Sequence, residues 1–278
     1  MLEILKERID DLRASRITRR SRHAAAVVHI SPNLYDYWQR TAHLEFPGIP
    51  KDKVFYASAL AGLLDFFACV RDSNKPCGLP SAAADSVWHA WAARAPGNLE
   101  RFCVQYFGRP IPHIEEADMR PQMEAALATC MVQARRLERR DPVAPSVPSL
   151  FSLDRQLRMP RGYSYELKNG SVVTQRLDSH GTPHGGQRYL GGLECVQLLA
   201  AGLISQQVYD HHMRYQPGTS SGGACGSSSS YSTSSDSSAA SCDSSSGGDG
   251  GCDGGGGGGD GGGGCGGGGG CGGGCGGS

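Results

Sequence analysis

The stretch from Pro217 to Ser278 most constrains what this chain can fold into, because it consists almost entirely of Gly, Ser, Cys and Asp. Such residues offer little apolar surface to bury, so nothing offsets the entropy that is lost when a chain becomes ordered. We therefore expect a disordered Gly/Ser/Cys-rich tail at 217–278. Roughly two hundred residues remain to build a core, which suits one domain.

The formal net charge of zero hides an uneven distribution. The tail holds five of the 27 acidic residues and none of the 27 basic ones, so the first 216 residues carry an excess of five positive charges. Surfaces that bind nucleic acid normally show clustered Lys and Arg interleaved with aromatic residues. The excess is too small for that class, and we expect protein partners and no nucleic acid.

Two segments bear on where in the cell the protein is found: the start of the chain and its most apolar window. Met1 to Glu7 mixes charged and apolar residues where a secretory signal needs a hydrophobic run, so we expect a cytoplasmic protein. The window from Val54 to Val70 is interrupted by Asp65 and is shorter than the roughly 20 residues that a bilayer requires. It predicts a buried helix and no transmembrane segment.

Hydrophobic periodicity predicts a mainly α fold: a compact helical domain with a small β-hairpin. We expect an amphipathic helical segment at 1–45, a helical core at 46–160, and a hairpin with two short helices at 161–216. The hairpin signal is the Asn169-Gly170 turn between two runs rich in Tyr, Val and Thr. Histidines 180, 184, 211 and 212 are expected in loops or at the surface. The five cysteines before the tail are expected to be reduced core residues (69, 77, 103, 130 and 195).

The first predicted helix carries a narrow apolar stripe. Leu2, Leu5, Ile9 and Leu12 follow helical spacing, and a run of arginines comes after them. A stripe of this kind usually packs on its own domain. A helix that lies on a membrane surface or docks on a partner is the alternative.

Two further helices form a predicted hairpin that carries most of the chemically capable side chains. Ser81 is a good N-cap, and Asp85 and His89 follow it one helical turn apart. We expect Asn98 to cap the second helix and Gly108 to end it.

Asp85, His89, Cys103 and His113 could close a tetrahedral zinc site, because each side chain is an established ligand of zinc. A structural polar cluster, in which Asp85 holds the His89 imidazole, is the reading that the sequence favours. A third possibility is a thiol nucleophile at Cys103 that is paired with His89 or His113. It would require an exposed thiol of low pKa, whereas Phe102 next to Cys103 indicates burial.

Asp85-x-x-Trp88-His89 is followed in order by Phe102-Cys103, Phe107-Gly108-Arg109 and His113. This order of motifs resembles the core of the glycine-rich domain-containing protein family, known from plants and bacteria. The resemblance covers roughly residues 54–155. It departs from the family where Trp91 and Leu99 stand in place of a frequent His and Tyr. The residues that match the family motif most closely are Trp88, Phe102, Phe107, Gly108 and Arg109. The resemblance implies no established activity.

No common catalytic motif occurs: the chain lacks a P-loop, H-E-x-x-H and C-x-x-C. The sequence therefore favours a non-enzymatic interaction or scaffold protein with a flexible tail. The alternative is a zinc-binding protein or thiol enzyme centred on the four residues named above.

Overall fold

Helix α4, Lys53–Arg71, lies at the centre of the helical domain and contacts α1, α5, α6, α8 and α9. The computed structural model describes residues 2–114 and 122–215, and the tail predicted to be disordered lies outside the described residues. The described helices are α1 Leu2–Arg20, α2 Ala24–Val27, α3 Asn33–Glu45, α4, α5 Ala82–Arg94, α6 Pro96–Phe107, α8 Met123–Leu137, α9 Ser149–Leu157, α10 Cys195–Ala200 and α11 Gln206–Tyr215, with a 3₁₀ turn η2 at Gly191–Leu193.

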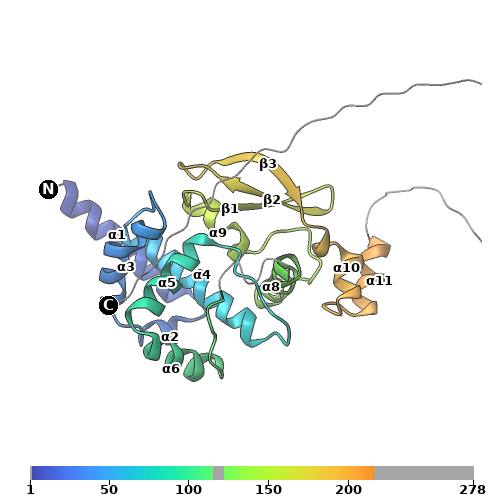
Figure 1. Ribbon diagram of the computed structural model, residues 1–278, viewed down its shortest axis with the longest axis horizontal. Coiled ribbons are helices and arrows are strands. Elements are labelled where there is room, and N and C mark those ends of the chain that lie inside the picture. The colour runs from blue at the N-terminus through green and yellow to red at the C-terminus, as the bar shows by residue number, and fades with distance from the viewer. Residues whose placement is uncertain (1, 115–121, 216–278) are drawn as a thin grey trace, which may run out of the picture. The chain divides into compact units, whose positions relative to one another are not determined.

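Three antiparallel strands form one sheet in the order β1-β2-β3, and this sheet lies beside the helices (Figure 1). The strands are β1 Tyr163–Lys168, β2 Ser171–Leu177 and β3 Pro183–Tyr189. Asn169 and Gly170 connect β1 to β2 and both have positive φ, at 51° and 82°. This is the backbone that an Asn-Gly turn favours, so the predicted hairpin is confirmed. Strand β3, which pairs with β2, was not predicted from the sequence.

The mainly α fold with a small antiparallel sheet is confirmed, α5 begins at its predicted cap, and α6 ends at its predicted glycine. The Asp52 carboxylate accepts from the Phe55 backbone N–H at 2.8 Å at the start of α4. The Ser81 hydroxyl accepts from the Ala84 backbone N–H at 3.2 Å at the start of α5. Gly108 ends α6 in the left-handed region, at φ 76°.

The predicted N-cap of α6 is wrong. Ala95 is the cap residue and Pro96 is the first helical residue, where its missing N–H costs nothing. Asn98 lies within the first turn, and its side-chain oxygen accepts from Trp91 Nε1 at 3.2 Å. The asparagine therefore joins α5 to α6 instead of capping a helix.

Helix α1 contacts α4, but the apolar stripe predicted to pack on the domain is exposed. Leu5, Ile9 and Leu12 are 56%, 39% and 72% exposed, and Ile4 beside them is 63% exposed. The helix instead meets the domain through other residues, including an ion pair between Asp11 and Lys53 of α4.

Helix α4 is long and apolar enough to cross a membrane by length and composition, yet 67% of its most apolar window is buried within the domain. It is the one helix of the described chain that passes this test. Phe67, Leu63 and Leu64 of α4 are fully buried and belong to the main core cluster. The predicted buried helix is therefore confirmed.

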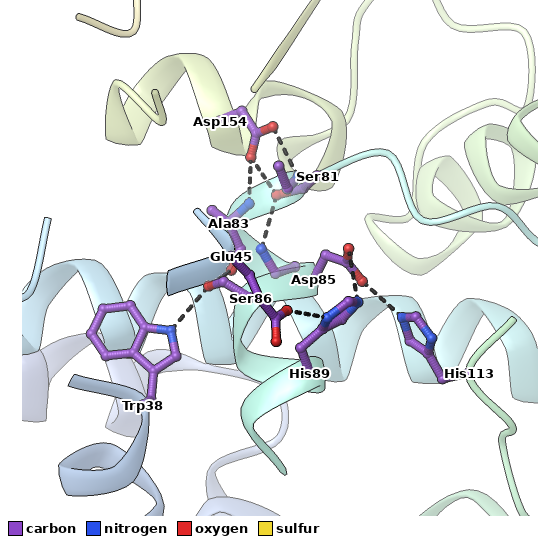
Figure 2. A network of polar contacts seen from close by, with 11 residues as sticks. Trp38, Glu45, Ser81, Ala83, Asp85, Ser86, His89, His113 and Asp154 are labelled. Carbon is purple, nitrogen blue, oxygen red and sulfur yellow. Dashed lines mark hydrogen bonds and ion pairs between the residues drawn. The ribbon is translucent and has the colours of Figure 1, made fainter. Parts of the chain in front are cut away.

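Asp154 of α9 links three elements at one point. Its Oδ1 accepts from Ser81 Oγ at 2.6 Å and from Ala83 N at 3.0 Å, and its Oδ2 accepts from Ala82 N at 2.9 Å and Tyr163 N at 3.0 Å. Burial raises the pKa of this carboxyl group, whereas the four donors act to lower it. Asp154 thus fixes the start of α5 relative to α9 and β1, as Figure 2 shows for its contacts with α5.

Candidate metal and ligand site

Asp85, His89 and His113 come together on one side of α5. Asp85 and His89 lie one turn apart on that helix, and His113 comes from the loop after α6. His113 Nε2 lies 3.1 Å from Asp85 Oδ1, and His89 Nε2 lies 3.5 Å from Asp85 Oδ2. Figure 2 shows the Asp85 carboxylate between the two imidazoles. One ligand atom from each residue lies within 4.8 Å of the others.

Glu45, the last residue of α3, holds His89 from the other side. Its Oε2 lies 2.5 Å from His89 Nδ1, and Figure 2 shows the imidazole between the carboxylates of Glu45 and Asp85. A carboxylate that accepts from Nδ1–H directs Nε2 toward a ligand and fixes the ring. Glu45 was missed by the sequence analysis, because nothing local marks a carboxylate that pairs with a histidine 44 residues away.

The surroundings of the three residues are partly apolar and partly open. The Trp88 ring meets the His113 ring edge to face with centroids 4.6 Å apart, and the two imidazoles meet in the same way at 4.6 Å. The side chains of His113, His89 and Asp85 are 20%, 27% and 32% exposed. The cluster is therefore accessible to an ion or a small molecule.

The geometry suits a first-row divalent metal. Two ligands that are each about 2.1 Å from a tetrahedral zinc ion lie about 3.4 Å apart. His113 Nε2 lies 3.1 Å from Asp85 Oδ1 and His89 Nε2 lies 3.5 Å from Asp85 Oδ2, both near this spacing, and the three ligand atoms together lie within 4.8 Å of one another. Two imidazole nitrogens and one carboxylate oxygen are donors that zinc and ferrous iron both accept.

Cys103, the fourth predicted ligand, is not part of this group. Its side chain is fully buried in the main core cluster, and the metal-type cluster found among the described residues contains only Asp85, His89 and His113. Burial raises the pKa of the Cys103 thiol to about 11, although a hydrogen bond from the Ile111 backbone lowers it. A buried thiol of raised pKa does not meet the requirements of a nucleophile.

The motif residues around the site have structural roles. Phe102 and Phe107 are buried in the core, and Gly108 ends α6. The Arg109 guanidinium donates to the carbonyl oxygens of Val70 and Ser73, which lie at and just beyond the end of α4. Arg109 thus satisfies acceptors that the helix end leaves open.

A cavity of about 740 Å³ opens beside the three ligand residues. This volume lies within the range of small-molecule sites, about 300 to 1,000 Å³. Trp88, Asp85, His89 and His113 line it from the helical side. Trp88 is 4% exposed, and its Nε1–H has no hydrogen-bond acceptor among the described residues.

The sheet supplies the other wall of the cavity. Cross-strand partners in an antiparallel sheet share one face, and the pairs Tyr163–Arg176, Tyr165–Thr174 and Thr174–Arg188 place five side chains on the same face. All five line the cavity, as does Arg161, which precedes β1. This wall was also missed by the sequence analysis, because it depends on the register of the strands.

One family model matches the part of the chain that holds most of this site. The model of the family described as UCP032817-like matches residues 51–187, which run from just before α4 into β3. The match includes Asp85, His89 and His113 and ends before Arg188. No curated protein and no solved structure matches the chain.

Proposed function

We propose that this protein binds a divalent transition-metal ion, with zinc the expected ion, at Asp85, His89 and His113, and that the ion acts on a small molecule in the adjoining cavity. The observation that carries the proposal is that one ligand atom from each of these three residues lies within 4.8 Å of the others, with Glu45 behind His89. Carboxylate–histidine–metal arrangements of this kind are common in metalloproteins.

The number of protein ligands favours a reactive ion over a structural one. Structural zinc sites are normally closed by four protein ligands, whereas catalytic sites have three and leave a position for water or substrate. Asp85, His89 and His113 would leave such a position facing a cavity large enough for a small molecule. Zinc at such a site would supply Lewis acid chemistry and a bound water of lowered pKa.

The test is elemental analysis of the full chain in which the six tail cysteines (225, 242, 252, 265, 271 and 275) are replaced by serine. This change prevents tail thiols from contributing metal. We expect close to one equivalent of metal per chain, and its loss in Asp85→Ala and His113→Ala. His180→Ala, which changes an exposed histidine outside the site, is the matched control and should keep the metal.

A purely structural polar cluster gives a different result. In that case the parent chain would contain no metal after dialysis against zinc, and Asp85→Ala and His113→Ala would only lower the midpoint of thermal unfolding. Metal retained by both variants would equally rule out the proposed site. Zinc-dependent stabilisation of the parent chain, absent in the variants, is an independent readout.

The interaction or scaffold function favoured by the sequence is the second candidate. The exposed stripe Leu5, Ile9 and Leu12 on α1 favours it, since a row of apolar side chains gains free energy when it is covered. Leu5→Glu and Leu12→Glu remove the apolar stripe without touching the core, so any association made through the stripe should be lost in both variants, and association that both variants keep would reject this use of the stripe. We also propose that the protein is cytoplasmic and that it is related to the glycine-rich domain-containing proteins.

A further inference from the structure

The wall that the sheet presents to the cavity is rich in arginine. Arg161, Arg176 and Arg188 all line the cavity, and all three are exposed. None of them forms an ion pair with a carboxylate within residues 2–114 and 122–215. The two other cations of the lining, Arg109 and Lys75, donate to backbone carbonyl oxygens. Three guanidinium groups without a carboxylate partner in the described chain thus lie on one wall.

The Arg176 guanidinium is held in place by the fold. The Arg176 guanidinium lies over the Tyr163 ring, 4.1 Å from its centroid, and donates to the Arg161 carbonyl oxygen at 3.3 Å. The Arg161 backbone N–H in turn donates to the Asp178 carbonyl oxygen at 2.9 Å. A cation that is positioned before a ligand arrives loses less entropy on binding it.

The two walls of the cavity differ in charge. The helical side carries Asp85 and Glu45 together with Lys75 and Arg109, so its formal charges balance, whereas the sheet wall carries the three arginines. Arginine presents a planar fork of donors that matches the oxygens of phosphate and carboxylate groups. Trp88 lines the cavity from the helical side. The cavity therefore offers guanidinium donors on its sheet wall and the Trp88 side chain in its helical wall.

We propose that the cavity binds a small organic anion whose phosphate or carboxylate group is held by Arg161, Arg176 and Arg188, while its remainder lies against Trp88. The anion site stands on the arginines and the cavity alone. That the far end of the ligand reaches an ion at Asp85, His89 and His113 rests on the proposed function. The substrate class implied is a small oxyanion-bearing molecule, and the volume excludes a polymer from being enclosed.

Calorimetric titration of the full chain tests the anion site. The protein is first treated with a chelator and dialysed, so that metal chelation by the probe makes no contribution. Inorganic phosphate and succinate are the probes for the two chemistries, with chloride at the same ionic strength as the reference. We expect one of the two probes to bind at least about tenfold more tightly than chloride, because the arginine fork makes charge-assisted, bidentate bonds. The tighter probe identifies the group.

Variants assign the binding to the sheet wall. Arg176→Gln and Arg188→Gln should each weaken the tighter probe about tenfold, and Arg188→Lys should recover only part of the loss because lysine lacks the fork. Arg101→Gln, an exposed arginine of α6 that does not line the cavity, is the matched control and should bind as the parent does. Circular dichroism checks that each variant is folded.

Two results would overturn the proposal. One is binding of phosphate and succinate that is no tighter than binding of chloride. The other is equal weakening in Arg101→Gln and in the cavity variants, which would indicate general surface charge. Metal content, measured on the same preparations before chelation, reports separately on the proposed metal site, so that either proposal can fail while the other stands.

Discussion

Glu45 Oε2 lies 2.5 Å from His89 Nδ1, and this contact joins the end of α3 to the middle of α5. It fixes the imidazole so that Nε2 points toward Asp85 (Figure 2). The contact also determines which nitrogen remains for an ion, because a hydrogen bond at one ring nitrogen selects the other as the ligand. The three-residue site is therefore a four-residue arrangement supported by two helices.

Replacement of Glu45 should weaken metal binding without removing a ligand. We expect Glu45→Ala to lower zinc affinity by about 10- to 100-fold, because the imidazole loses its orientation and some of its basicity. Glu45→Gln keeps an oxygen acceptor without the charge and should lose less. The measurement is competition with a fluorescent zinc chelator, using the chain without tail cysteines. Asp36→Asn, an exposed carboxylate of the same helix, is the control, and a Glu45→Ala affinity equal to its affinity would count against the arrangement.

Asp154 should be among the most stabilising polar side chains of the domain. Asp154→Ala would leave the Ser81 hydroxyl and three backbone N–H groups without their acceptor in a buried position. We expect a loss of about 3 to 5 kcal/mol in the free energy of unfolding. Urea unfolding measures it, with Asp72→Asn as the exposed control that should change by less than about 0.5 kcal/mol. A loss of similar size in both variants would contradict the role assigned to Asp154.

The Asp154 carboxylate leaves no room for a side chain at position 162, where the chain has glycine. A Cβ atom at this position would lie 2.6 Å from Asp154 Oδ2 and 2.9 Å from its Cγ, and the four hydrogen bonds prevent the carboxylate from moving away. We expect Gly162→Ala to cost about 1 to 3 kcal/mol of unfolding free energy. Gly97→Ala, where a Cβ meets nothing within 4 Å, should be neutral or stabilising.

A double-mutant cycle isolates that contact. Because Asp154→Ala removes the two atoms that the new Cβ would approach most closely, Oδ2 and Cγ, and leaves only a contact with the Cβ of residue 154 at 3.0 Å, Gly162→Ala should cost less in the Asp154→Ala background. Additive losses in the double variant would show that the collision with the carboxylate is not the reason for glycine at this position. Both measurements use the same urea titration.

The helical core could be predicted from the sequence because its signals are local. Asp52 and Ser81 cap their helices through bonds to residues three positions ahead, and Asn169-Gly170 fixes its own turn. Asp85 and His89 could likewise be placed together, since helical spacing alone brings them onto one side of α5. Strand β3 gave no such signal, because Gly185 and Gly186 interrupt any alternation of apolar residues.

The parts of the site that could not be predicted depend on tertiary contacts. Glu45 reaches His89 only after α3 packs on α5, and the arginine wall exists only in the observed register of β1, β2 and β3. Cys103 was included because its residue type suits zinc. In the structure Cys103 lies on the buried side of α6 next to Phe102, and its thiol is not part of the three-residue cluster.

Cys103 should be unreactive in the folded protein. Since burial raises the pKa of Cys103 to about 11 from the ordinary thiol value of 9.0, the folded chain at pH 8 holds about a hundredfold less Cys103 thiolate than the unfolded chain. The same shift affects stability: the folded chain keeps the proton up to about pH 11, while the unfolded chain releases it from about pH 9. The unfolding free energy should therefore fall as the pH rises through this window. Peptide mapping after brief iodoacetamide treatment resolves Cys103 from the other cysteines, and denatured chain provides the reference rate. If Cys103 is alkylated at equal rates in the folded and the denatured chain, its thiol is accessible, and the hypothesis that it acts as a nucleophile would have to be reconsidered.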